Sequence, residues 1–296
     1  MEKSLAIGAI IEDSCISAGL VNLETRKIVD ETLRQSRINP KGSSKEIISS
    51  WVNVLKEVAR FNTNGTLQIG MGIPGACDYE SGVFKANDMD RYGSLYNKNI
   101  KELVAAELSI SPSSIRLLND SVCFLQGEVF GGAVRYHKKS IGITLGMGLG
   151  SAIFSNNQVS DANLWRMPFK GKIAEELISI RWIVKRFTEL SGIKATTILE
   201  MKSHDPNPLI QKVFDEFAQN LADFFIEIIE RENPEAIVIG GHMQASNRLF
   251  FEQVTSMVKA HGINIPIVRT LFGEKATVVG TAATWYDFDL QDKKPS

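Results

Sequence analysis

The N-terminal part of the chain alternates short apolar runs with polar interruptions, a pattern typical of paired strands. Residues 4–11 and 15–21 are two apolar runs separated by Glu12-Asp13-Ser14, which predicts a β-hairpin with a polar tip. Ser43 followed by Glu46 is the signature of a capping box, and apolar residues then recur at helical spacing as far as Ala59. The chain therefore begins with strands and continues into an amphipathic helix.

The rest of the chain alternates buried-type strands with amphipathic helices, which indicates α/β layers, while the hairpins favour mixed sheets. A strand–turn–strand opens each half, so we expect a two-lobed α/β protein that resembles the duplicated actin-like ATPase (ribonuclease H-like) fold. The predicted lobes are 1–119, joined by the C-terminal helix 276–290, and 120–275. Further strands are predicted at 27–29, 67–72, 115–118, 140–145, 151–154, 236–239 and 267–269, and helices at 99–108, 121–130, 173–190, 209–232, 247–261 and 276–286.

Composition narrows the class of protein. The chain has 296 residues, 44% of them hydrophobic, and a formal net charge of −1. No field of one sign would attract nucleic acid or a membrane surface, and we expect neither as a partner. The three cysteines Cys15, Cys77 and Cys123 lie far apart without a C-x-x-C pair, which favours reduced thiols in or near the core. No signal peptide or membrane-spanning stretch is visible, and we expect a cytoplasmic protein.

Four motifs occur in order along nearly the whole chain: Gly70-Met71-Gly72-Ile73-Pro74-Gly75, Leu118-Asn119-Asp120 with Gly127-Glu128, Leu145 to Gly150, and Pro234 to Gly241. Together they resemble the ROK family of sugar kinases and sugar-responsive repressors. Repressor members of that family carry an N-terminal winged helix, whereas the first hairpin here begins at Ser4, so we expect the kinase branch.

Asn119 and Asp120 follow a predicted strand, and ligands collect at the carboxyl ends of strands in open α/β sheets. A carboxylate there can take the proton of an attacking sugar hydroxyl; such general-base catalysis contributes roughly 10²–10⁴-fold. The resemblance implies that Asp120 is the catalytic base and Asn119 a sugar partner, with Asn87 and Glu175 also binding sugar. The alternatives are a helix cap for Asn119-Asp120, a loop asparagine for Asn87 and an exposed helix residue for Glu175.

Two glycine-rich segments are candidates for nucleotide binding. A turn with glycines lets backbone amides face a phosphate, although Met147 stands where the family usually has threonine. The resemblance implies that the glycine pair after strand 236–239 admits adenine or ribose. A plain hairpin and a plain strand-to-helix turn are the alternatives. The residues concerned are Gly146, Gly148, Gly150, Gly240 and Gly241.

The first hairpin departs from the family pattern Asp-x-Gly-Gly-Thr, which holds Mg²⁺ and cradles phosphate. Ile10 replaces the aspartate, and Glu12 and Asp13 bring two carboxylates. Like charges about 4 Å apart repel by roughly 4 kcal/mol at an effective dielectric of 20, so a triphosphate here needs Mg²⁺ held by Glu12 or Asp13. Ser14 keeps one hydroxyl donor for a nucleotide. The alternative is an ordinary solvated hairpin tip.

The sugar side also departs from the family. Arg166 stands where a histidine contacts both sugar and zinc, and the cysteine-rich zinc loop is missing, so no zinc is expected. A guanidinium at Arg166 suits an anionic ligand such as a sugar phosphate or sugar acid, unless it pairs with a nearby carboxylate. Val122 replaces a family asparagine.

Two functions follow from these residues. The first is ATP- and Mg²⁺-dependent phosphorylation of a hexose or hexose derivative, with Asp120 as the base. The second is a non-catalytic relative that binds a sugar or a partner without phosphoryl transfer. Asn119-Asp120 favours the first function. The residues that favour the second are Ile10, Glu12, Asp13 and Met147. We also expect a homodimer.

Overall fold

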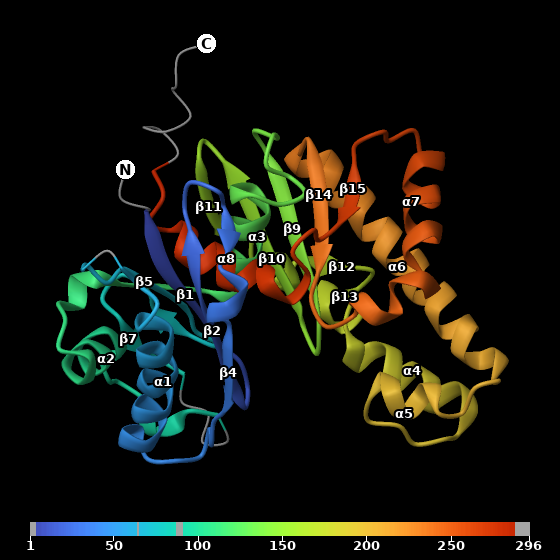
Figure 1. Ribbon diagram of the computed structural model, residues 1–296. Helices are drawn as coiled ribbons and strands as arrows, with labels where there is room; N and C mark the ends of the chain where they lie inside the picture. Colours follow the sequence, from blue (N-terminus) through green and yellow to red (C-terminus); the bar gives the residue numbers. More distant parts are fainter. Residues whose placement is uncertain (1–3, 64, 87–90, 288–296) are drawn as a thin grey trace, which may run out of the picture. The chain divides into compact units, whose positions relative to one another are not determined.

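The computed structural model describes residues 4–63, 65–86 and 91–287 (Figure 1). The chain forms two compact units: one runs up to Arg135 and includes the residues from Glu274 onward, and the other is Tyr136–Gly273. Helix α3 (Asp120–Phe130) lies in the first unit, whereas the boundary drawn from the sequence assigned it to the second lobe. The reason is its packing against helix α8 (Ala276–Ala283).

The first unit is built on a mixed sheet of order β3-β2-β1-β5-β8, with β4 also paired to β2. β1 and β2 are antiparallel, while β1, β5 and β8 run parallel. Helices α1 and α2 lie on one face of this sheet, and α3 and α8 lie on the other (Figure 1). The bounds are β1 (Leu5–Ile11), β2 (Cys15–Asn22), β3 (Lys27–Ile28), β4 (Arg34–Arg37), β5 (Ile69–Gly72), β6 (Cys77–Asp78), β7 (Val83–Phe84), β8 (Ile115–Leu118), α1 (Ser44–Ala59) and α2 (Ile100–Leu108).

The capping box predicted before α1 is confirmed. The Ser43 hydroxyl accepts the Glu46 backbone N–H at 3.3 Å, and the Glu46 carboxylate accepts the Ser43 N–H at 2.7 Å. Trp51, Val52 and Leu55 are fully buried on the apolar side of the helix. Two backbone groups that the helix itself cannot pair are thus satisfied at its start.

Helix α8 packs so closely that only glycine fits at its contacts. A Cβ atom added to Gly8 or Gly70 would overlap the α8 carbonyl oxygens of Val278 or Thr281. On the other side, a Cβ on Gly280 would overlap the Cys123 carbonyl oxygen of α3. Glycines therefore let α8 approach the backbone of both the sheet and α3.

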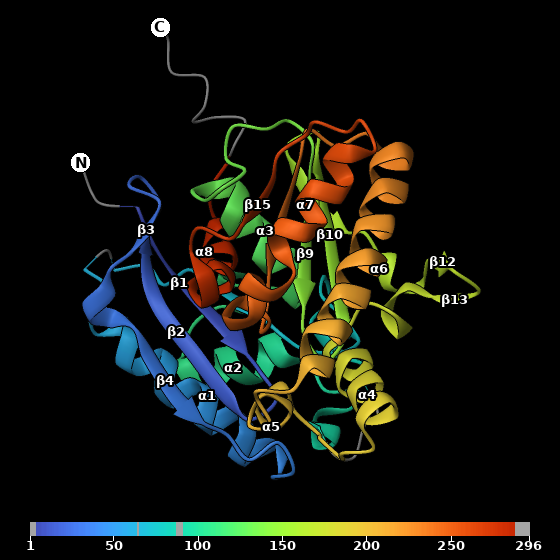
Figure 2. The ribbon, with the colours of Figure 1, turned by 90° about the vertical axis from the view of Figure 1, so that its right-hand side faces the viewer.

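The second unit is built on a sheet of order β11-β10-β9-β14-β15. Helices α6 and α7 cover one face of it, where phenylalanines such as Phe214, Phe217 and Phe250 are buried (Figure 2). The bounds are β9 (Ser140–Leu145), β10 (Leu149–Ser155), β11 (Gln158–Asp161), β12 (Pro168–Phe169), β13 (Lys172–Ile173), β14 (Ala236–Gly240), β15 (Ile267–Arg269), α4 (Ile180–Ser191), α5 (Ile198–Lys202), α6 (Pro208–Glu232) and α7 (Phe251–Ala260).

Two predicted helix starts are wrong. The helix expected at 247–261 begins at Phe251, after a 3-10 helix at Gln244–Leu249. The helix expected at 173–190 begins only at Ile180, because Ser179 caps it by accepting the Trp182 N–H at 3.3 Å. The residues before it form β13 and a 3-10 turn, Ala174–Glu176. None of the helices in the described ranges has the length and apolar character to span a bilayer.

Candidate functional site

Asn119 and Asp120 lie at the carboxyl end of β8, as the sequence predicts. Asn119 is the N-cap of α3, and its Oδ1 accepts the Ser121 N–H at 2.9 Å and the Ser121 hydroxyl at 2.5 Å. Asp120 Oδ1 also accepts the Ser121 N–H, at 2.8 Å, while the Asp120 residue is exposed. The helix cap therefore fixes the backbone that carries the carboxylate, and α3 presents its positive end to it. Asn87 lies outside the described residues.

Tyr79 joins this group from the turn after β6. Its hydroxyl donates to the Gly75 carbonyl oxygen at 2.9 Å. Burial raises the pKa of the Tyr79 phenol, a hydrogen bond from the Asn119 side chain opposes the increase, and nearby Cys77 and Asp120 add to it. The phenol thus connects the segment after β5 to the segment after β8, which the sequence analysis did not predict. The polar turn Glu80-Ser81-Gly82 was the available signal for this hairpin.

The three thiols are held in their protonated form. Burial raises the pKa of Cys77 to about 11 and that of Cys15 to about 11, the latter aided by its hydrogen bond to the Glu12 carboxylate. Burial raises the pKa of Cys123 well above its ordinary value, with Asp120 nearby adding to the increase. Since the thiolate is the nucleophile, these cysteines are poor nucleophiles at neutral pH.

We expect iodoacetamide to alkylate Cys15 and Cys77 of the native protein roughly 100-fold more slowly at pH 8 than in urea, because an unperturbed thiol ionises near pH 8.5. Their raised folded-state pKa stabilises the fold fully below about pH 8.5, and this stabilisation is lost as the pH rises towards 11. Mass spectrometry of peptides from pH-stepped reactions measures the rates. Equal native and urea rates at pH 8 would contradict the assignment.

The residues at the tip of the β1–β2 hairpin form an ion pair and hydrogen bonds with other residues of the first unit. Asp13 forms an ion pair with Arg91, and Glu12 accepts a hydrogen bond from the Cys15 thiol at 2.9 Å. Ser14 is exposed, and its carbonyl oxygen accepts the Ile38 N–H at 2.8 Å. Both carboxylates that the sequence offered to Mg²⁺ therefore have other partners.

Ile10, at the position of the family's metal-side aspartate, is a core residue. It is 6% exposed, and a Cβ on Gly72 would lie 2.5 Å from its Cδ1 atom. No group of three or more His, Cys, Asp or Glu side chains within the described ranges is arranged to hold a metal ion.

The side chain of Glu175 lies against the glycine-rich turn between β9 and β10 and fills the space beside it. The Gly146 N–H donates to the Gly148 carbonyl oxygen at 3.0 Å, which closes the turn. The Leu149 N–H donates to Glu175 Oε2 at 3.0 Å, and a Cβ on Gly148 would overlap that oxygen. A residue predicted to bind sugar and a turn predicted to face phosphate thus form one structural feature.

The remaining glycines of the two segments lie within strands of this sheet or directly after one. Gly150 lies within β10, paired with Thr144, and Gly240 is the last residue of β14. Gly241 has a φ of +90°, and a Cβ there would lie 2.5 Å from the Leu145 carbonyl oxygen. The bare face of Gly241 is therefore covered by the end of β9.

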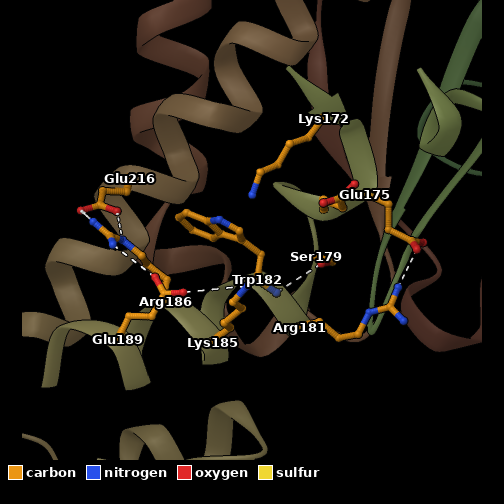
Figure 3. A pocket seen from close by; sticks show the side chains of 10 residues that line it. Lys172, Glu175, Ser179, Arg181, Trp182, Lys185, Arg186, Glu189 and Glu216 are labelled. Carbon is orange, nitrogen blue, oxygen red and sulfur yellow. Dashed lines mark hydrogen bonds and ion pairs between the residues drawn. The ribbon is translucent and has the colours of Figure 1, made fainter. Parts of the chain in front are cut away.

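A hollow of about 460 Å³ adjoins Glu175 on the surface of the second unit (Figure 3). The Trp182 ring is half-buried against Phe217, and the Lys172 side chain extends towards it. Arg186 forms a two-fold ion pair with Glu216, with Nε–Oε2 at 2.6 Å and Nη2–Oε1 at 3.2 Å. The lining has as many basic as acidic side chains: Lys172, Arg181, Lys185 and Arg186 against Glu175, Glu176, Glu189 and Glu216. An anion gains no net attraction from this lining.

Arg166 is exposed and makes no ion pair with the residues that the structure describes. Its guanidinium lies over the Trp165 ring, 4.4 Å from the centroid. The turn that carries it is held to β10 by the Leu164 N–H, which donates to the Ser151 hydroxyl at 2.9 Å. Arg166 is therefore stacked rather than neutralised by a neighbouring carboxylate.

Comparison with known proteins extends these observations. The ROK family model matches residues 15–162 and 168–287. A glucokinase of Thermotoga maritima is 25% identical, over 96% of this chain and 98% of the relative. An uncharacterized protein of Clostridium perfringens is also 25% identical, and there the match spans only 62% of the relative.

Solved structures with the same fold include two enzymes and a regulator. The ROK hexokinase of Thermus thermophilus matches with a TM-score of 0.78 at 18% identity, over 97% of this chain and 99% of that one. A Streptomyces griseus ROK glucokinase bound to glucose and AMPPNP matches with a TM-score of 0.74 at 18% identity, over 95% of this chain and 99% of that one. A ROK transcriptional regulator, a homologue of the Escherichia coli MLC protein, matches with a TM-score of 0.74 at 15% identity, over 94% of this chain and 77% of that one. The predicted actin-like ATPase fold is thereby confirmed.

Proposed function

Because the chain belongs to the ROK family, we propose that it transfers a phosphoryl group from ATP to a hydroxyl group of a hexose or hexose derivative. The observation that carries the proposal is the exposed Asp120 carboxylate at the carboxyl end of β8, with its backbone fixed by the Asn119 cap. The glucokinase and hexokinase relatives support a sugar as the acceptor.

In the proposed reaction the oxygen of the sugar hydroxyl attacks the γ-phosphorus atom of ATP, and the bond from that phosphorus to ADP breaks. Asp120 accepts the proton that the hydroxyl loses. Asn119 has committed its Oδ1 to Ser121, and its side chain also hydrogen-bonds the Tyr79 phenol, so the remaining amide N–H is what it offers to a sugar oxygen. Each Glu175 carboxylate oxygen already accepts one hydrogen bond, from the Leu149 N–H or from Arg181, and each keeps a lone pair for a sugar hydroxyl.

The choice of ATP as the phosphoryl donor is supported by the relatives rather than by residues of this chain. AMPPNP in the Streptomyces structure supports ATP as the donor. The residues of this chain do not fit an Mg²⁺ site at the first hairpin, because Asp13 is paired with Arg91 and Glu12 with Cys15. We assign no step to a protein-held metal ion.

The test is a titration with Mg-ATP by calorimetry, followed by a coupled assay of ADP release with hexoses, amino sugars and sugar acids. We expect millimolar or tighter binding of Mg-ATP and turnover with at least one sugar, since catalysis needs both ligands bound. If Mg-ATP fails to bind at millimolar concentration, the kinase proposal is wrong.

A second candidate is a ROK protein that binds a sugar or a partner without phosphoryl transfer. Two observations favour it: Ile10 is buried where the family has an aspartate, and the Leu149 amide of the glycine-rich turn is occupied by Glu175. Sugar binding without ATP binding in the same titrations distinguishes this function from the kinase.

A further inference from the structure

The Glu175 carboxylate is held at both of its oxygens. Oε2 accepts the Leu149 N–H at 3.0 Å, and Oε1 accepts a hydrogen bond from Arg181 Nη2 at 2.5 Å (Figure 3). Gly148 permits this arrangement, since any side chain there would overlap Oε2. The carboxylate therefore has one orientation, set by a backbone donor on one side and a guanidinium on the other.

Arg181 approaches Glu175 from helix α4, which is itself anchored to the turn. The Ile180 N–H, one of the first in α4, donates to the Gly146 carbonyl oxygen at 2.8 Å. Arg181 is the next residue, so its Cα atom is fixed relative to the turn. The guanidinium is half-exposed and the carboxylate less so, which leaves the pair open to a ligand.

Each Glu175 oxygen keeps acceptor capacity after these bonds, because a carboxylate oxygen has two lone pairs. A carboxylate held in one orientation can accept two neighbouring hydroxyl groups without first losing rotamer freedom. An anionic group would instead be repelled by the same carboxylate. The geometry suits a polyhydroxylated, uncharged ligand at this point.

We propose that Arg181 is a positioning residue, which orients Glu175 and thereby sets the affinity of the site for an uncharged sugar. The proposal rests on the proposed function, and nothing in the four motifs of the sequence includes Arg181. Arg186, on the same helix, provides a matched comparison, since it pairs with Glu216 and not with Glu175.

The experiment compares Arg181→Met, Arg181→Lys and Arg186→Met with the unmodified chain. Glucose, N-acetylglucosamine and Mg-ATP are titrated separately by calorimetry, and hydrogen exchange of the Leu149 amide is followed by NMR. In Arg181→Met we expect the sugar Kd to rise roughly threefold to tenfold, as befits a half-exposed charge pair, and Leu149 exchange to accelerate at least threefold. Arg181→Lys should recover part of both effects. Mg-ATP affinity should not change, and Arg186→Met should match the unmodified chain in every measurement.

The outcomes separate the inference from the function. Unchanged Leu149 exchange and sugar affinity in Arg181→Met would overturn the positioning role. Weaker Mg-ATP binding with unchanged sugar binding would make Arg181 a phosphate contact and overturn it as well. If the unmodified chain binds neither glucose nor N-acetylglucosamine while Leu149 exchange still accelerates in Arg181→Met, the binding of these two sugars at Glu175 is overturned and the orientation of Glu175 by Arg181 stands.

Discussion

Asp120→Asn is expected to lower kcat for sugar-dependent ADP release by roughly 10²–10⁴-fold, because the amide cannot accept the hydroxyl proton. The substitution keeps an oxygen that can accept the Ser121 N–H, so the start of α3 should persist. Loss of the charge at the helix N-terminus should reduce the free energy of unfolding by less than about 1 kcal/mol. A coupled assay gives kcat, and calorimetry gives the sugar Kd, which should stay within about threefold.

Glu102→Gln is the matched control for this experiment. Glu102 lies in the first turn of α2, which is also capped by an asparagine, Asn99. Glu102→Gln removes an exposed carboxylate from the first turn of a helix, at its third residue where Asp120 is the first residue of α3, and full activity is expected. A kcat of Asp120→Asn close to that of Glu102→Gln would show that Asp120 is not the base.

Gly280→Ala is expected to destabilise the protein by about 3 kcal/mol or more, which exceeds the usual cost of overpacking because the clash is with backbone. The added methyl group would overlap the Cys123 carbonyl oxygen of α3, which cannot move without shifting the whole helix. The better helix propensity of alanine, about 1 kcal/mol, offsets only part of this. Thermal unfolding should show a decrease in Tm of about 10 °C.

Gly19→Ala provides the comparison in the same unit. Gly19 pairs with Gly8 in the β1–β2 ladder, and a Cβ there would lie 3.4 Å from the Ile28 and Leu33 side chains, an ordinary contact. Its effect on the free energy of unfolding should stay within about 1 kcal/mol. If Gly280→Ala lowers the free energy of unfolding as little as Gly19→Ala does, then α8 and α3 can separate slightly and the glycine contact is not essential.

Local sequence patterns predicted most of the scaffold around Asp120. The Ser43–Glu46 capping box, the β1–β2 hairpin and the strand that ends before Asn119 all depend on residues close together in the chain. Their structures match the predictions because short-range hydrogen bonds and periodic apolar positions determine them. Asn119 does cap α3, which was the alternative to a ligand site at this position, and the cap leaves the Asp120 carboxylate exposed.

Long-range contacts could not be predicted in the same way. Gly148 is a glycine because a side chain from Glu175, far along the sequence, lies against it. Tyr79 reaches the site through a two-strand hairpin too short to give a periodic signal. The start of α4 was misplaced because apolar periodicity continued upstream of Ser179, and the cap at Ser179 outweighed it.

The packing of α8 against β1, β5 and α3 has a consequence for synthesis on the ribosome. The first unit contains residues from both ends of the chain, while Tyr136–Gly273 is continuous. The continuous unit can fold as soon as it emerges, whereas the glycine-lined surface of the first unit stays uncovered until α8, which follows that unit in the chain, has been translated. A nascent chain must therefore keep its first sheet from aggregating while the whole second unit is made.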